Sequence, residues 1–144
     1  MYYEMIYPQI GTVSEFMSQL LQSPHMNHHL KLIEHQFIPT FTEVLLIVMN
    51  AQPNKFQGQV INMIMQVFVE FAANDITYPH FLEEPVLLNT LINGFVLKPK
   101  RVFPSVIFVE LSSIYQNLAG VDNIGYLNQI LDAGLPVAIL HLLV

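Results

Sequence analysis

The sequence predicts an all-α protein, built as a short right-handed stack of helical repeats that forms an α-solenoid. Apolar residues recur at helical spacing almost throughout, and the alternation typical of a half-buried strand is sustained nowhere. Signals that start and stop helices stand at several places. The pattern of one long helix recurs 47 residues later, and other segments recur at 49 residues. This period is close to the ~40–47 residues of helical-repeat units.

The composition predicts one soluble domain that spans residues 1–144. Hydrophobic residues make up 53% of the chain and charged residues only 11%, against about 25% charged in ordinary soluble domains. The longest apolar runs, such as Val44–Met49, fall well short of the ~20 residues that a bilayer requires. The N-terminus lacks the basic start and apolar stretch of a secretory signal. We therefore expect a cytoplasmic location, with a nuclear one also open, and no membrane partner.

The first two predicted helices follow from their start signals. Ser23 suits an N-cap and Pro24 a first helical position, which predicts a helix from about Pro24 to His35. Pro39 then stands in the first turn of a second helix that carries apolar residues to Met49. Turn residues around Pro53 end it.

The third predicted helix and its repeat supply the strongest pattern. Four apolar residues of the segment after Pro53 share one helical face, and four residues after Pro104 share the equivalent face. The first set is Val60, Ile64, Val67 and Phe71, and the second is Ile107, Leu111, Ile114 and Leu118. Each member of the second set follows its counterpart by 47 residues, so the two helices are expected to occupy equivalent places in successive units.

Residues 114–144 carry a resemblance to a family. The stretch "IGYLNQILDAGLPVAILHLL" is similar to the armadillo-repeat seam, in which a small-residue turn ends one helix and a Leu-Pro pair opens the next. The stretch "IYQNLAG" resembles the end of an armadillo third helix. The resemblance, with a HEAT-like variant left open, implies a partial unit at 14–22, complete units at 23–74 and 75–121, and a truncated unit at 122–144.

The armadillo resemblance also implies a binding groove. In armadillo proteins the third helices line a concave groove, where an Asn near each helix end binds the backbone of an extended peptide. Asn117 matches that position, whereas Glu70 replaces it in the earlier unit and the tryptophans of import receptors are missing, so nuclear-import cargo is not expected. The residues implied to face the groove are Gln59, Asn62, Gln66, Glu70, Glu110, Ser113 and Asn117. This weakly acidic line suits an extended or basic peptide, although any solvated helix face would show such residues.

The few basic residues argue against a nucleic-acid partner. Five Lys and Arg stand against eleven Asp and Glu, which leaves no basic stripe for a polyanion. Three of the five lie at Lys98–Arg101, as a nuclear-import signal or an anion contact would. A solvated loop around Pro99 is the favoured interpretation, because so short a cluster is common by chance.

Candidates for metal binding and catalysis are weak. His25 and His29 stand four residues apart on a predicted helix, a spacing at which two imidazoles can share a metal. No third ligand accompanies them in a recognisable motif, so a solvent-facing helix is favoured and no cofactor is predicted. The sequence also lacks a nucleophile elbow and a phosphate-binding glycine loop. We expect no enzymatic activity.

Three functional hypotheses remain. The first is a scaffold module that binds a peptide or a partner helix along the groove. The second is a structural piece that continues into a longer solenoid or forms a homo-oligomer through an apolar C-terminal end, comprising Val137, Ile139, Leu140 and Leu143. The third and weakest is a histidine-rich metal-binding helical protein.

Overall fold

The protein is all-α, as predicted, in a computed structural model that describes residues 7–23, 26–51, 55–74, 77–99, 103, 105–119, 128, 131–132 and 134–143. These residues contain helices and no β-strand. The helices are α1 (Tyr7–Gln22), α2 (Met26–Glu34), α3 (Phe37–Asn50), α4 (Gln57–Ala73), α5 (Tyr78–Leu82), α6 (Pro85–Asn89), η2 (Thr90–Leu97), α7 (Ser105–Ala119) and α9 (Leu135–Leu143).

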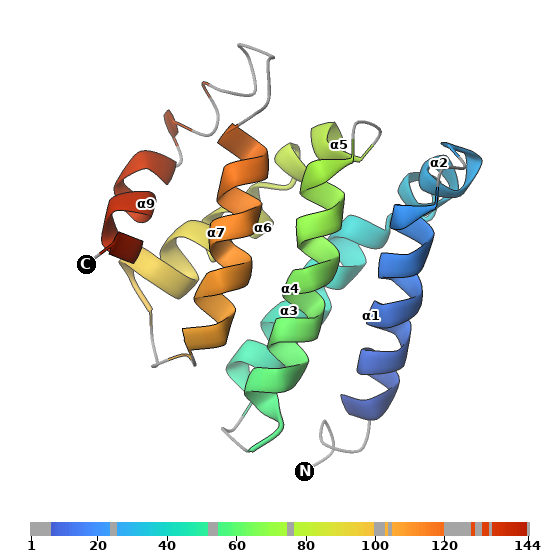
Figure 1. Ribbon diagram of the computed structural model, residues 1–144, viewed down its shortest axis with the longest axis horizontal. Helices are drawn as coiled ribbons and strands as arrows, with labels where there is room; N and C mark the ends of the chain where they lie inside the picture. Colours follow the sequence, from blue (N-terminus) through green and yellow to red (C-terminus); the bar gives the residue numbers. More distant parts are fainter. Residues whose placement is uncertain are drawn as a thin grey trace.

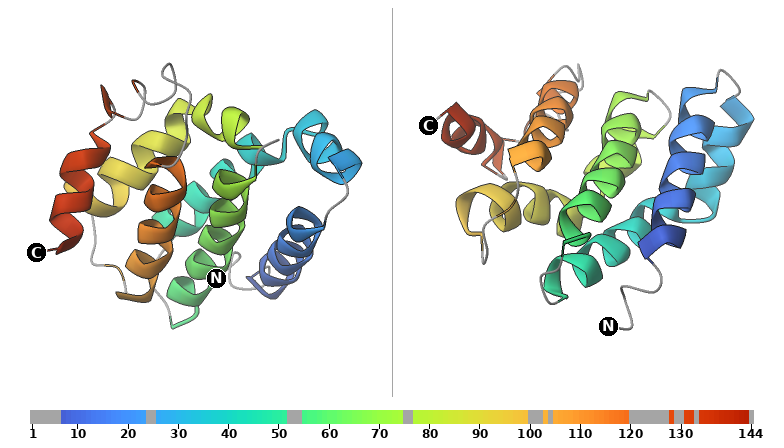
Figure 2. Two further views of the ribbon diagram at one scale, coloured as in Figure 1. Left: turned by 45° about the horizontal axis from the view of Figure 1, so that its top comes forward. Right: turned by 60° about the horizontal axis from the view of Figure 1, so that its bottom comes forward.

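The long helices are arranged in two layers. Helices α1, α4 and α7 lie side by side in one layer with α4 in the middle (Figure 1). Helices α3, α6 and η2 lie behind them, and α9 packs against both α7 and η2 (Figure 2). Because α4 has a neighbour on each side and a layer behind it, only one narrow face of α4 is left open to solvent.

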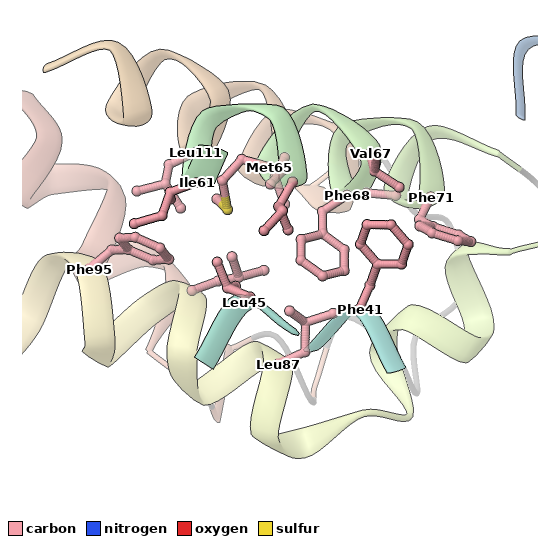
Figure 3. Close-up of a cluster of buried hydrophobic side chains, with 14 of the residues drawn as sticks. Phe41, Leu45, Ile61, Met65, Val67, Phe68, Phe71, Leu87, Phe95 and Leu111 are labelled. Atoms are coloured by element: carbon pink, nitrogen blue, oxygen red, sulfur yellow. The ribbon is translucent and has the colours of Figure 1, made fainter. Parts of the chain in front are cut away.

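The core lies between the two layers. In Figure 3, aromatic and aliphatic side chains of α4 face those of α3, α6 and η2 across the core, and Leu111 of α7 lies beside Ile61 of α4. Phe41 and Phe68 meet edge to face, with ring centroids 6.4 Å apart. All eight residues of the two predicted apolar faces on α4 and α7 are buried, so this part of the prediction is confirmed.

Two of the turns between helices use positive φ angles. Gly134 has φ +94° and α9 begins at Leu135, as the Leu-Pro pattern predicts. Gln36, with φ 57° and ψ 43°, makes a corresponding turn between α2 and α3, so α3 begins at Phe37 and Pro39 lies in its first turn, as predicted. An L-residue is strained in this left-handed conformation, and Gln36 adopts it where the chain bends by 65° between α2 and α3.

Helix α1 is longer than the sequence suggests. The fragment expected at 14–22 is the second half of a helix that begins at Tyr7. Pro8 is tolerated because it stands in the first turn, where its missing N–H has no helical partner to lose. Gly11 is tolerated because it permits a close approach to α4, since a Cβ at this position would lie 2.9 Å from the Met63 sulfur.

A π-helical segment, η2, continues α6 from Thr90 and was not predicted. The Lys98 N–H donates to the Asn93 carbonyl oxygen at 2.7 Å, which is the i→i+5 bond of a π-helix. Such segments are rare and occur frequently at functional sites.

Within the described residues, no single helix is both long and apolar enough to cross a membrane. The segments His28–Glu34 and Phe37–Asn50 meet the length and hydropathy criteria only as a pair, and a bend of 65° separates them.

Candidate functional site

The open face of α4 forms a groove with α1. Two adjoining cavities lie along the line where these helices meet, with volumes of about 350 and 290 Å³. Gly11, Glu15 and Met63 line both cavities. The two cavities therefore adjoin where Met63 approaches Gly11 closely. The remaining lining residues are Tyr7, Pro8, Thr12, Phe56, Gln59 and Val60 in the larger cavity, and Ser14, Ser18 and Gln66 in the smaller one. We call this feature the α1–α4 groove.

The groove contains buried polar atoms without partners. Tyr7 is 4% exposed and Ser14 is 2% exposed, and neither hydroxyl has a hydrogen-bond partner among the described residues. Asn62 of α4 lines neither cavity; it is half-buried, and its buried Oδ1 likewise has no partner among the described residues. Buried polar atoms in proteins are nearly always hydrogen-bonded, to protein or to water. Tyr7 lines the larger cavity and Ser14 the smaller one, so each cavity has a residue with an unsatisfied buried hydroxyl in its wall.

The layer made of α1, α4 and α7, which we call the front layer, is acidic. Helices α1, α4 and α7 each carry a single charged residue, and these are Glu15, Glu70 and Glu110. Glu15 is exposed and lines both cavities, whereas Glu70 accepts a hydrogen bond from Gln22 Nε2 at 3.3 Å and joins α1 to α4. Outside these helices Lys55 lies nearby, with its ammonium nitrogen 4.9 Å from the centroid of the Phe56 ring.

The residues that were predicted to face the groove lie in different places. Gln59 and Gln66 are exposed and line the α1–α4 groove. On α7, Glu110 and Ser113 are half-buried, and the Ser113 hydroxyl donates to the Val109 carbonyl at 3.3 Å within its own helix.

The side-chain amide of Asn117 already forms a hydrogen bond within the protein. Its Nδ2 donates to the Val69 carbonyl of α4 at 3.2 Å, so one amide hydrogen joins α7 to α4. The residue is half-buried at this contact. The bond links two segments 48 residues apart and fixes α7 beside α4.

The C-terminal apolar residues are partly described. Val137 is 51% exposed and Leu140 is 62% exposed on α9, whereas Ala138 between them is fully buried. The backbones of Ile139 and Leu143 belong to α9, but their side chains lie outside the described part of the structure. An exposed apolar strip on the outermost helix is thus present at Val137 and Leu140.

The candidate metal ligands are not brought together. His25 lies outside the described residues, and His29 is buried rather than solvent-facing. The Asn74 amide nitrogen lies 3.1 Å from His29 Nδ1, which favours the tautomer in which Nδ1 accepts. Among the described residues, no group of three or more His, Cys, Asp or Glu side chains could hold a metal ion.

The α1 half of the groove was missed by the sequence analysis. Gly11, Ser14 and Ser18 place small residues along one side of α1, and Glu15 and Gln22 continue that side. Small residues at i, i+3 and i+7 signal a close helix contact, and this signal was available in the sequence. The sequence did not disclose that α4 is the helix that packs there.

Comparisons with known proteins do not identify the chain. No protein-family model matches it, and no curated protein or solved structure is significantly similar to it.

Proposed function

We propose that the protein is a non-enzymatic interaction module, built as a short armadillo- or HEAT-like solenoid, that binds an extended peptide or a partner helix on its front layer. The observation that carries the proposal is the α1–α4 groove, with its two adjoining cavities and the exposed Glu15, Gln59 and Gln66 side chains that line them. The side-by-side packing of α1, α4 and α7 supports the solenoid, because these helices take equivalent places in the proposed units (Figure 1).

The chemistry of the groove favours a basic peptide. The Gln59 and Gln66 side chains each offer a donor and an acceptor, which is what the backbone of an extended chain requires. Glu15 adds a carboxylate beside both cavities, and charge complementarity of this kind gives specificity and speeds association. The apolar surface of Val60 and Met63 can receive the stem of a long side chain.

The experiment is a selection of peptides followed by measured affinities. Twelve-residue peptides selected from a random library on the purified protein should be rich in Lys and Arg. Their affinity, measured by fluorescence anisotropy, should fall about tenfold or more with Glu15→Lys, which replaces attraction by repulsion. The matched control is Glu43→Lys, which makes the same change at an exposed position of α3 in the other layer. Equal losses in the two variants, or none in either, would show that the groove is not the binding site.

A second candidate function is self-association, or continuation into a longer solenoid, through α9. The observation that favours it is the exposure of Val137 and Leu140, because capping repeats normally have a polar outer face. Light scattering at high micromolar concentration should detect oligomers that dissociate with Leu140→Glu. A wild-type chain that stays monomeric under these conditions would contradict self-association.

A further inference from the structure

A third cavity lies in the other layer of the molecule, away from the α1–α4 groove. It has a volume of about 450 Å³ and lies where α3 meets the junction of α6 and η2. This volume is within the ~300–1,000 Å³ of ordinary small-molecule sites. Its lining is apolar at Leu46, Met49 and Phe103, and otherwise consists mainly of amide side chains and one ammonium group.

The polar side chains at this cavity retain unused hydrogen-bonding groups. Asn93 Nδ2 donates to Asn89 Oδ1 at 2.7 Å, so the pair is held together on one side of the helix. That bond leaves the side-chain amide hydrogens of Asn89 and the side-chain Oδ1 of Asn93 without partners among the described residues. The Asn50 amide across the cavity is also unbonded in this part of the chain. The cavity can therefore offer several donors to one ligand.

The π-helical turn of η2 brings the charged residue to the same side. In an α-helix, Lys98 would be rotated about 140° from Asn93, since each residue turns the chain by about 100°. The i→i+5 bond from the Lys98 N–H to the Asn93 carbonyl instead returns the chain toward Asn93 after five residues. Lys98 consequently lines the same cavity as Asn89 and Asn93.

The charge at the cavity is positive. Lys98 is the single charged residue in the described lining, and it forms no ion pair with any described residue. It is also the first residue of the one basic cluster in a chain whose formal net charge is −6. An anionic ligand would therefore be drawn to this end of the molecule rather than to the acidic front layer.

We propose that the cavity between α3 and the α6–η2 junction binds a small organic anion, which places an apolar ring against Met49 and Phe103 and a phosphate or carboxylate against Lys98 and the Asn89–Asn93 pair. An ammonium group and amide N–H groups are donors that both anions accept. This site is independent of the proposed groove function, because it uses different residues in a different layer.

The test uses the Met49 methyl group as a local reporter. Protein labelled with ¹³C at its methionine methyls is titrated with phenyl phosphate, with benzoate and with phenol. We expect the Met49 resonance to move and saturate with one or both anions, and the resonance of the fully buried Met65 to stay in place. The stronger of the two anions identifies the preferred group. Phenol, which has the ring without the charge, should bind about tenfold more weakly, because charged hydrogen bonds are the strong ones.

Two variants and a control complete the test. Lys98→Gln and Asn93→Leu should each weaken anion binding about fivefold or more, whereas Lys31→Gln, which removes an exposed lysine from α2, should leave it unchanged. Circular dichroism verifies that each variant is folded. The proposal is overturned if neither anion moves the Met49 resonance at millimolar concentration. It is also overturned if phenol binds as well as the anions, or if Lys98→Gln binds them as well as the wild type.

Discussion

Replacement of Gln57 should measure how much the junction between α3 and α4 contributes to the stability of the fold. Gln57 is the first residue of α4, is 5% exposed, and donates from Nε2 to the Val48 carbonyl at 2.6 Å and the Ala51 carbonyl at 3.1 Å. The last carbonyl groups of a helix have no partner within the helix. The Gln57 side-chain amide, at the start of α4, therefore caps the C-terminal end of α3.

The expected loss for Gln57→Leu is about 2 to 3 kcal/mol. Each hydrogen bond contributes about 1 kcal/mol net, and the buried Val48 carbonyl then keeps only the longer bond from the Ala51 N–H at 3.3 Å, which adds up to about 1 kcal/mol more. Leucine keeps most of the side-chain volume, so a cavity contributes little. For a chain of 144 residues the loss corresponds to a decrease in Tm of roughly 6 to 10 °C.

Urea denaturation and thermal unfolding, followed by circular dichroism, measure the effect. The matched control is Gln66→Leu, which makes the same change at an exposed position of the same helix and should alter stability by no more than about 0.5 kcal/mol. Gln57→Glu should be worse than Gln57→Leu at neutral pH, because a carboxylate would face two carbonyl oxygens. Acidification should recover part of that loss by restoring an O–H donor. If Gln57→Leu and Gln66→Leu had equal unfolding midpoints, the role assigned to Gln57 would be wrong.

Three further outcomes are expected. Tyr115→Phe should cost about 1 to 2 kcal/mol at neutral pH, because the Tyr115 hydroxyl donates to the buried Leu91 carbonyl of η2. Burial raises the pKa of Tyr115 above the ordinary value of about 10, so above pH 10 the unfolded state loses this proton before the folded state does. The free energy of unfolding of the wild type should then fall by up to ~1.4 kcal/mol per pH unit. A stability difference between the wild type and Tyr115→Phe that widens above pH 10 instead would refute this. Gln36→Gly should raise stability by roughly 0.5 kcal/mol in urea denaturation, because relief of the left-handed conformation outweighs the added chain entropy, and a clear loss would contradict the strain at φ 57°. Phe68→Ala should cost about 3 to 5 kcal/mol, since the ring is fully buried between the layers, and a loss below ~1 kcal/mol would exclude that packing.

The core was predictable because its evidence is local. The apolar faces of α4 and α7 follow from 3.6-residue periodicity, and residues such as Ile64 and Ile114 are buried as that periodicity predicts. The turn at Gly134 was predictable for the same reason, because a glycine before a Leu-Pro pair signals its own backbone conformation. The turn at Gln36 carried no such signal, because glutamine has no preference for positive φ.

The candidate sites were only half predictable. Gln59 and Gln66 were expected to face a groove and do line one, but the sequence did not reveal that Glu15 of α1 supplies the other wall. The π-helical turn at Lys98 was likewise not predicted, because no residue preference signals a π-helix and the packing of η2 against α9 is not visible in the sequence.

The sequence by itself determined that the chain is helical and which faces of α4 and α7 enter the core, because each helix carries its own periodicity. Tertiary structure decided which surfaces meet. Gln22 reaches Glu70, and Asn117 reaches the Val69 carbonyl, across 48 residues in each case. These contacts arise because packing the buried faces against α3, α6 and η2 leaves α1, α4 and α7 side by side. The polar residues at their shared edges then become either links between helices or the walls of a groove, according to how closely the helices approach.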